Sequence, residues 1–224
     1  MDLLNQCVES GGLYSVLTLP ESNLLSPFLK EVMEYNVVGT NTFQINGHTL
    51  GITLEDVLFL TRLKIDGDPV LIKNYSDVHS ISILRDVISD ISELRTIALA
   101  TDRDDNCRLL RDAIRYAWGA AILAHLQYHL ERFHQTGKLY GCSWLLVCFF
   151  LIRIPKLWDS LRIEDARQEL EAGALDQHPF PMAWIMTKLH SNNAIFNDHR
   201  GGYRRRMHFA FQDLKDEHFF SLSS

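Results

Sequence analysis

A pair of histidines is one candidate for a metal-binding site in this chain. His125 and His129 stand four residues apart on a predicted helix, a spacing that can present two imidazole rings to one metal ion. The protease motif H-E-x-x-H is absent, because Leu126 occupies the position of the general base. No nearby cysteine or glutamate completes a ligand set. We therefore interpret the pair as surface or boundary histidines and predict no bound metal.

Cys142 and Ser143 are the candidate nucleophiles. They follow a glycine, but a nucleophile elbow also needs a second glycine and a preceding strand, and neither is present. We interpret both as small residues at the start of a buried helix. A pyridoxal-dependent transferase would need a lysine Schiff base and a phosphate-binding loop. The sequence shows neither, so we predict no catalytic residue and no cofactor, and a transferase-like enzyme remains the least favoured alternative.

The concentrated cationic segment of the chain reads RGGYRRR, and arginines beside an aromatic ring can grip phosphates and stack on bases. The candidate nucleic-acid-binding residues are Arg200, Tyr203, Arg204, Arg205 and Arg206. The same segment could serve as a nuclear import patch, or be a solvated helix start whose tyrosine packs inward. The net charge of −6 opposes a protein whose main task is to coat phosphates, although a local patch can override it.

The elements that would position these residues begin with a β-hairpin. Asn46-Gly47 supplies the two positive φ angles of a type I′ turn, which predicts pairing of residues 43–45 with 48–52. Two-residue closure places Ile45 opposite His48 and Phe43 opposite Leu50. Together with Ile52, these residues form the face expected to be buried, whereas the other face carries polar residues: Thr42, Gln44 and Thr49.

A capped helix is predicted directly after the hairpin. Thr53 offers an N-cap hydroxyl, and Asp56 provides the carboxylate of a capping box. An apolar stripe at helical spacing follows, made of Leu54, Val57, Leu58 and Leu60. The helix is expected to end near Leu63, before a turn that contains Gly67 and Pro69.

Size and composition favour one mainly α domain spanning residues 1–224, with the small β-hairpin in its N-terminal third. A chain of 224 residues buries about 70% of its unfolded surface on folding. Further helices are expected near 27–35, 77–100, 108–134, 141–154, 162–174, 184–189 and 203–219, while about the first 22 residues are expected to be loosely ordered. The segment 144–152 is the most apolar, but it is shorter than the ~20 residues of a membrane span, so a buried core helix is predicted.

The cysteines and the N-terminus indicate an intracellular protein. The four cysteines show no Cys-x-x-Cys spacing, which is typical of reduced thiols. The chain starts with Met-Asp and no basic region, so no signal peptide is expected.

Four blocks of sequence resemble the plant mobile domain, also called the aminotransferase-like plant mobile domain, of transposon-derived, maintenance-of-meristems-like proteins. The first block contains Thr40, Thr42, Phe43, Thr53, Leu54, Glu55, Asp56, Val57, Ile65, Asp66, Gly67, Pro69 and Val70. The second block runs from Arg115 to Ala124 and includes Tyr116, Trp118 and Gly119. The third leads from Gly141 to the sequence Arg153-Ile154-Pro155, and the weaker fourth contains 181–184 and 203–205.

The chain departs from the family pattern at three places. Residues 94–106 stand where relatives usually have an apolar helix, Phe149 and Ile152 replace an expected Trp and Glu, and the Trp-x-Pro-Tyr motif that usually follows the last helix is missing. The resemblance therefore implies a domain incomplete at its C-terminus.

The resemblance also implies a function. It implies a non-catalytic, nuclear protein-interaction module linked to transcriptional regulation, transposable-element silencing and meristem maintenance. The implied partner is a protein, in some relatives a serine/threonine phosphatase-like one. A nucleic-acid-binding module remains the main alternative. The sequence predicts no membrane association and leaves open the oligomeric state and whether the chain is a host protein or transposon-encoded.

Overall fold

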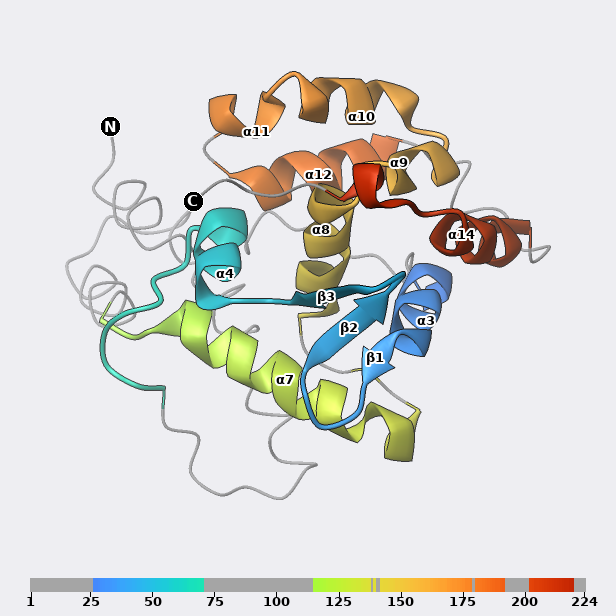
Figure 1. Ribbon diagram of the computed structural model, residues 1–224. Helices are drawn as coiled ribbons and strands as arrows, with labels where there is room; N and C mark the ends of the chain where they lie inside the picture. The colour runs from blue at the N-terminus through green and yellow to red at the C-terminus, as the bar shows by residue number, and fades with distance from the viewer. Residues whose placement is uncertain are drawn as a thin grey trace.

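A computed structural model describes residues 26–70, 115–137, 139, 142–178, 180–191 and 202–219. This part of the chain is mainly α-helical with one small antiparallel sheet, as the sequence predicts (Figure 1). Its helices are α3 (Ser26–Glu34), α4 (Leu54–Thr61), α7 (Trp118–Thr136), α8 (Ser143–Arg153), α9 (Leu157–Ser160), α10 (Glu164–Glu171), α11 (Ala174–Gln177), α12 (Pro181–Ser191), α14 (Gly202–Gln212) and the 3₁₀ turn η1 (Asp216–His218). The helix expected at 77–100 and the loosely ordered first 22 residues lie outside the described residues.

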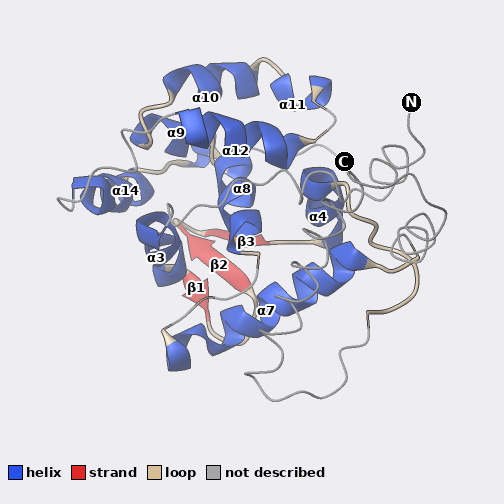
Figure 2. Ribbon diagram, turned by 180° about the vertical axis from the view of Figure 1, so that it is seen from behind, coloured by secondary structure: helices blue, strands red, loops and turns tan. Residues whose placement is uncertain are grey.

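The sheet contains the predicted hairpin and one additional strand. β2 (Thr42–Ile45) pairs with β3 (His48–Gly51), with Phe43 opposite Leu50 and Ile45 opposite His48, which confirms the register. Asn46 and Gly47 have φ of 48° and 88°, the positive values that a type I′ turn requires. The third strand, β1 (Asn36–Val37), lies on the other side of β2 (Figure 2). It was not predicted, because two residues give no periodic signal.

Helix α8 forms the centre of the core. All residues from 145 to 152 are buried, because this helix has no polar side and must be surrounded by other elements. The sheet, α4 and α12 lie around α8, and α10 and α11 form an outer layer beyond α12 (Figure 1). Aromatic contacts connect the sheet to the C-terminal helix. The rings of Phe43 and Phe150 lie 5.0 Å apart, those of Phe150 and Phe211 6.3 Å, and those of Phe211 and Tyr35 5.3 Å.

Three predicted helices have different bounds in the structure. The helix expected from about 108 begins at Trp118. Residues 115–117 are not helical, and Tyr116 forms an isolated β-bridge with Asp68; residues 108–114 lie outside the described part. The last helix ends at Gln212, well before the expected position 219, and a turn separates it from η1. The predicted 162–174 helix is shorter, because Gly173 at φ 82° separates α10 from α11.

Candidate functional site

The first and third sequence blocks meet at Asp56. One carboxylate oxygen of Asp56 accepts hydrogen bonds from the backbone N–H of Thr53 at 2.9 Å and from its hydroxyl at 3.0 Å, which completes the predicted capping box. The other oxygen accepts from the guanidinium of Arg153 at 2.7 Å. Asp56 is buried, and Arg153 also lies over the ring of Phe149 at 5.5 Å. This ion pair therefore joins the start of α4 to the end of α8.

The first and second blocks meet where the 66–69 turn lies against residues 115–119. Asp68 donates its N–H to the carbonyl of Arg115 at 2.8 Å and accepts from the N–H of Ala117 at 2.9 Å. Gly67 has φ of 127°, and a Cβ at this position would lie 2.4 Å from the Arg115 carbonyl oxygen. Only a glycine permits this approach. An ion pair between Arg115 and Asp68 at 2.9 Å adds an exposed contact across the junction.

Gly119 allows a second close approach at the same junction. Its N–H donates to the carbonyl of Lys64 at 2.8 Å. A Cβ on Gly119 would lie 3.0 Å from that carbonyl oxygen and 3.0 Å from the Ile65 side chain. The small residues of the second block therefore let α7 pack directly against the loop that follows α4.

The other residues of the first block have either a structural contact or an exposed position. The Thr40 hydroxyl donates to the carbonyl of Val37 at 2.9 Å and is 2.7 Å from the Thr42 hydroxyl, and Phe43 is fully buried. Leu54, Glu55, Asp66 and Pro69 are exposed.

Three apolar or aromatic side chains of α4 and the second block are exposed. Leu54 and Leu58 are 37% and 40% exposed, although both belong to the apolar stripe expected in this helix. The helix buries Val57 and Leu60 against its neighbours, and the 54/58 edge faces outward. Tyr116, in the second block, is 39% exposed and contacts the ring of Trp118 edge-on at 5.9 Å. These exposed positions could not be predicted, because an apolar residue type is compatible with both environments.

The histidine pair has the expected geometry. The Nε2 atoms of His125 and His129 lie 3.2 Å apart, and both rings are half-buried. Burial, with the neighbouring His129, lowers the pKa of His125. Within the described residues, no group of three or more histidine, cysteine or acidic side chains is arranged to hold a metal ion. The structure therefore shows these two side chains as a hydrogen-bonded pair.

Neither candidate nucleophile lies on a strained turn. Cys142 precedes α8, and Ser143 begins it, as predicted. Burial raises the pKa of Cys142 and raises that of Cys148 strongly, so both are thiols rather than thiolates near neutral pH.

The candidate nucleic-acid residues are only partly described. Arg200 lies outside the described residues, and for Tyr203 and Arg204 the structure describes the α14 backbone alone. Arg205 is exposed and Arg206 is half-buried. One turn after Arg205, Phe209 is 54% exposed on the same helix, a feature absent from the sequence prediction. An arginine and an aromatic side chain therefore stand at adjacent positions of one outer helix face.

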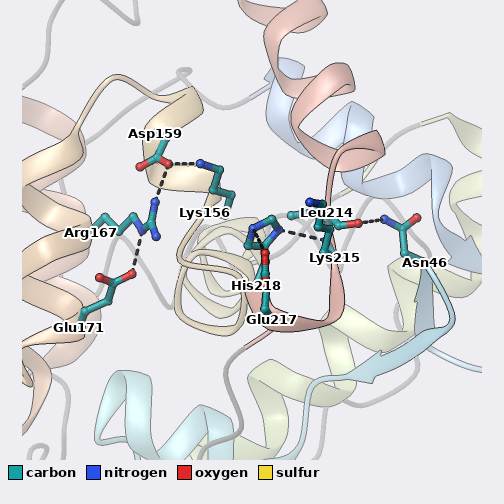
Figure 3. Close-up of polar contacts among 9 residues, drawn as sticks. All are labelled: Asn46, Lys156, Asp159, Arg167, Glu171, Leu214, Lys215, Glu217 and His218. Atoms are coloured by element: carbon teal, nitrogen blue, oxygen red, sulfur yellow. Dashed lines mark hydrogen bonds and ion pairs between the residues drawn. The ribbon is translucent and has the colours of Figure 1, made fainter.

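The C-terminal segment is attached to the tip of the hairpin. The side-chain amide of Asn46 donates to the carbonyl of Leu214 at 2.8 Å, and the N–H of Lys215 donates to Nδ1 of His218 at 3.0 Å (Figure 3). His48 is 3.0 Å from Asp216 and stacks on Phe219. Asn46 thus provides both the φ of the turn and the contact that holds the chain after α14.

The same close-up shows an ion network between α9 and α10. Asp159 binds Lys156 at 2.8 Å and Arg167 at 2.7 Å, and Arg167 also reaches Glu171 at 2.8 Å (Figure 3). The hydrogen bond to Glu171 is the main reason why the pKa of Arg167 is raised. The charges of this network neutralise one another, so it serves as a packing contact.

No family model, no curated protein and no solved structure matches the chain. None of the described helices is both long and apolar enough to cross a membrane.

Proposed function

We propose that this chain is a non-catalytic protein-interaction module of the plant mobile domain type that acts in the nucleus. The resemblance of its sequence blocks supports this function. By that resemblance, the partner is a protein, and a serine/threonine phosphatase-like protein is the first candidate. Roles in transcriptional regulation, transposable-element silencing and meristem maintenance follow from the same resemblance.

One observation carries the non-catalytic part of the proposal. The polar groups of the blocks bind to one another: Asp56 to Arg153 and Thr53, and Asp68 to Arg115. A catalytic carboxylate has to reach its substrate from an accessible position with an open hydrogen-bonding site. Asp56 is instead buried against the helix that it caps, so its chemistry supports the fold.

The test is affinity capture from nuclear extract with the purified chain as bait. We expect a reproducible set of captured proteins, including a phosphatase-like protein. The substitutions Leu58→Ser and Tyr116→Ser are each expected to reduce the number of captured proteins, because both side chains are exposed. Thr187→Ser on the exposed side of α12 is the matched control and is expected to capture the full set. The proposal is contradicted if the chain captures no more protein than a denatured bait does. It is also contradicted if the purified protein contains a stoichiometric metal or a pyridoxal chromophore.

A nucleic-acid-binding module is the second candidate, favoured by the exposed Arg205 and Phe209 on one face of α14. The test is fluorescence anisotropy with single-stranded DNA and RNA at increasing salt. This function requires an affinity that falls steeply with salt and is lost when Arg204, Arg205 and Arg206 become alanine. Equal binding of the parent and the triple variant excludes the α14 face as the site.

A further inference from the structure

The two outer strands of the sheet differ in what lies beside them. On the β1 side, the N–H of Gln44 donates to the carbonyl of Tyr35 at 2.9 Å, and the buried side chain of Asn36 donates to the carbonyl of Leu130 in α7 at 3.3 Å. Helix α7 therefore lies against the β1 side of the sheet at Asn36. β3 forms the opposite edge of the sheet (Figure 2).

The hydrogen-bonding direction of β3 follows from its register. Because Gln44 directs its N–H toward β1, Gln44 and its partner Thr49 form a pair that does not exchange hydrogen bonds. The alternation of an antiparallel ladder then points the N–H and C=O groups of Thr49 and Gly51 away from β2. In the described part of the chain, no backbone hydrogen bond outside the β2–β3 pair involves either residue.

β3 also lacks most of the features that usually protect a sheet edge. Its sequence, His-Thr-Leu-Gly, contains no lysine, carboxylate or proline, and its residues pair one-to-one with β2 without a bulge. The Thr49 hydroxyl is tied back to Gln44 Oε1 at 2.8 Å, on the outer face of the sheet, and Gly51 has no side chain. Another strand can therefore approach this edge closely.

The surroundings of the edge define the character of the occupant. β3 leads within three residues to the exposed Leu54, which gives an apolar flank at that end. Carboxylates stand at both ends: the exposed Glu55 beyond Leu54, and Asp216, with its side chain 93% exposed, beside His48. The edge therefore suits an extended segment that combines aliphatic with basic side chains.

We propose that the β3 edge is the docking site for an extended, basic and aliphatic segment of a partner protein, which adds to the sheet as a fourth strand. This inference rests on the proposed interaction function and specifies how the partner binds. Thr49 and Gly51 supply the main-chain hydrogen bonds, Leu54 contacts an aliphatic side chain, and the flanking carboxylates attract the basic ones. Because β3 has only four residues, the strand supplies few hydrogen bonds and the flanking contacts add to the affinity.

The experiment uses the full chain and a fluorescein-labelled peptide of alternating lysine and valine, seven residues long. A second peptide of the same sequence carries N-methyl groups on all of its internal amides, so its charge is unchanged while the strand-pairing N–H groups of both edges are blocked. We expect saturable anisotropy binding for the first peptide and about tenfold weaker binding for the second, because main-chain hydrogen bonds are lost. Equal binding of both peptides, or no saturable binding up to about 1 mM, overturns the proposal.

A pair of protein variants tests the same main-chain hydrogen bonds by changing the protein in place of the peptide. Thr49→Pro removes the outward N–H, and proline is tolerated at such an edge position. Thr49→Val keeps the N–H and, like the proline variant, loses the hydrogen bond to Gln44. We expect the valine variant to bind like the parent and the proline variant to bind about tenfold more weakly. Should the proline variant fail to fold, the N-methylated peptide still decides the question on the parent protein.

Other occupants of the edge give distinct results. A parent that dimerises in sedimentation, together with a monomeric Thr49→Pro variant, assigns the edge to a second copy and overturns the proposal. Peptide binding seen only after removal of residues 220–224 assigns it to the chain itself, with the same consequence. If the parent captures nuclear proteins and the proline variant captures the same amounts, the interaction function stands and strand addition is wrong. If the parent captures nothing, the proposed function fails, whatever the peptide does.

Discussion

Asp56→Ala is the substitution that best tests whether the first sequence block is structural. It removes the acceptor of the capping box, which costs about 1 kcal/mol. It also leaves Arg153 without its partner. Breaking a fully buried pair costs about 3–5 kcal/mol, but the side chain of Arg153 is 22% exposed, so about 1–2 kcal/mol is the better figure. The expected loss in the free energy of unfolding is about 2–3 kcal/mol, or about 4–12 °C in Tm for a chain of this size.

The assay is urea denaturation followed by tryptophan fluorescence and far-UV circular dichroism. Glu55→Ala is the matched control, because it removes an exposed first-turn carboxylate of the same helix and should cost under about 0.5 kcal/mol. A double-mutant cycle with Arg153→Met isolates the ion pair and should give a coupling energy of about 1–2 kcal/mol. A loss for Asp56→Ala no greater than that for Glu55→Ala, or a coupling near zero, refutes the structural role.

Three further outcomes are expected. Gly119→Ala should destabilise the protein by about 1–3 kcal/mol, since its Cβ would meet the Lys64 carbonyl at 3.0 Å, whereas Ala124→Ser on the exposed side of α7 should cost under about 0.5 kcal/mol in the same urea assay. Because the pKa of His125 is lowered below 6.5 in the folded state, the unfolded chain binds more protons as pH falls through 6.5, and the free energy of unfolding should decrease from about pH 7.5 to about pH 5.5. That decrease should be smaller in His125→Gln; an identical slope contradicts the burial argument. Burial of the Cys148 thiol and its raised pKa predict that it stays unmodified by iodoacetamide in native protein near pH 8 and reacts in urea, as peptide mapping by mass spectrometry would show.

The sequence predicts this fold best where the determinants are local. The Asn46-Gly47 turn fixes the register of the hairpin, and Thr53 and Asp56 form the capping box within three residues of each other. The buried helix α8 is likewise visible in an unbroken apolar run. In these cases the controlling contacts lie within one turn or one hairpin, so the residue types alone decide the geometry.

The bounds and exposed faces of several elements depend on contacts between distant residues. The start of α7 is set by Asp68, 47 residues before its ion-pair partner Arg115. The chain after α14 is held by Asn46, 168 residues before Leu214. Leu58 faces outward although its type and spacing match those of buried residues. Helical periodicity gives the direction of each side chain, whereas the packing of other elements decides which direction is buried.

The candidate site shows the same difference between features set by local sequence and features set by contacts between distant residues. The sequence by itself determined the hairpin, the capped helix, the buried helix and the residue types of the four blocks, because each follows from backbone preference and short-range hydrogen bonding. Only the tertiary structure decided that Asp56 meets Arg153 across 97 residues, that Gly119 contacts the loop after α4, and that β3 is the edge strand of the sheet in the described part of the chain. These are consequences of how the elements pack, and packing depends on the shape of all of them together.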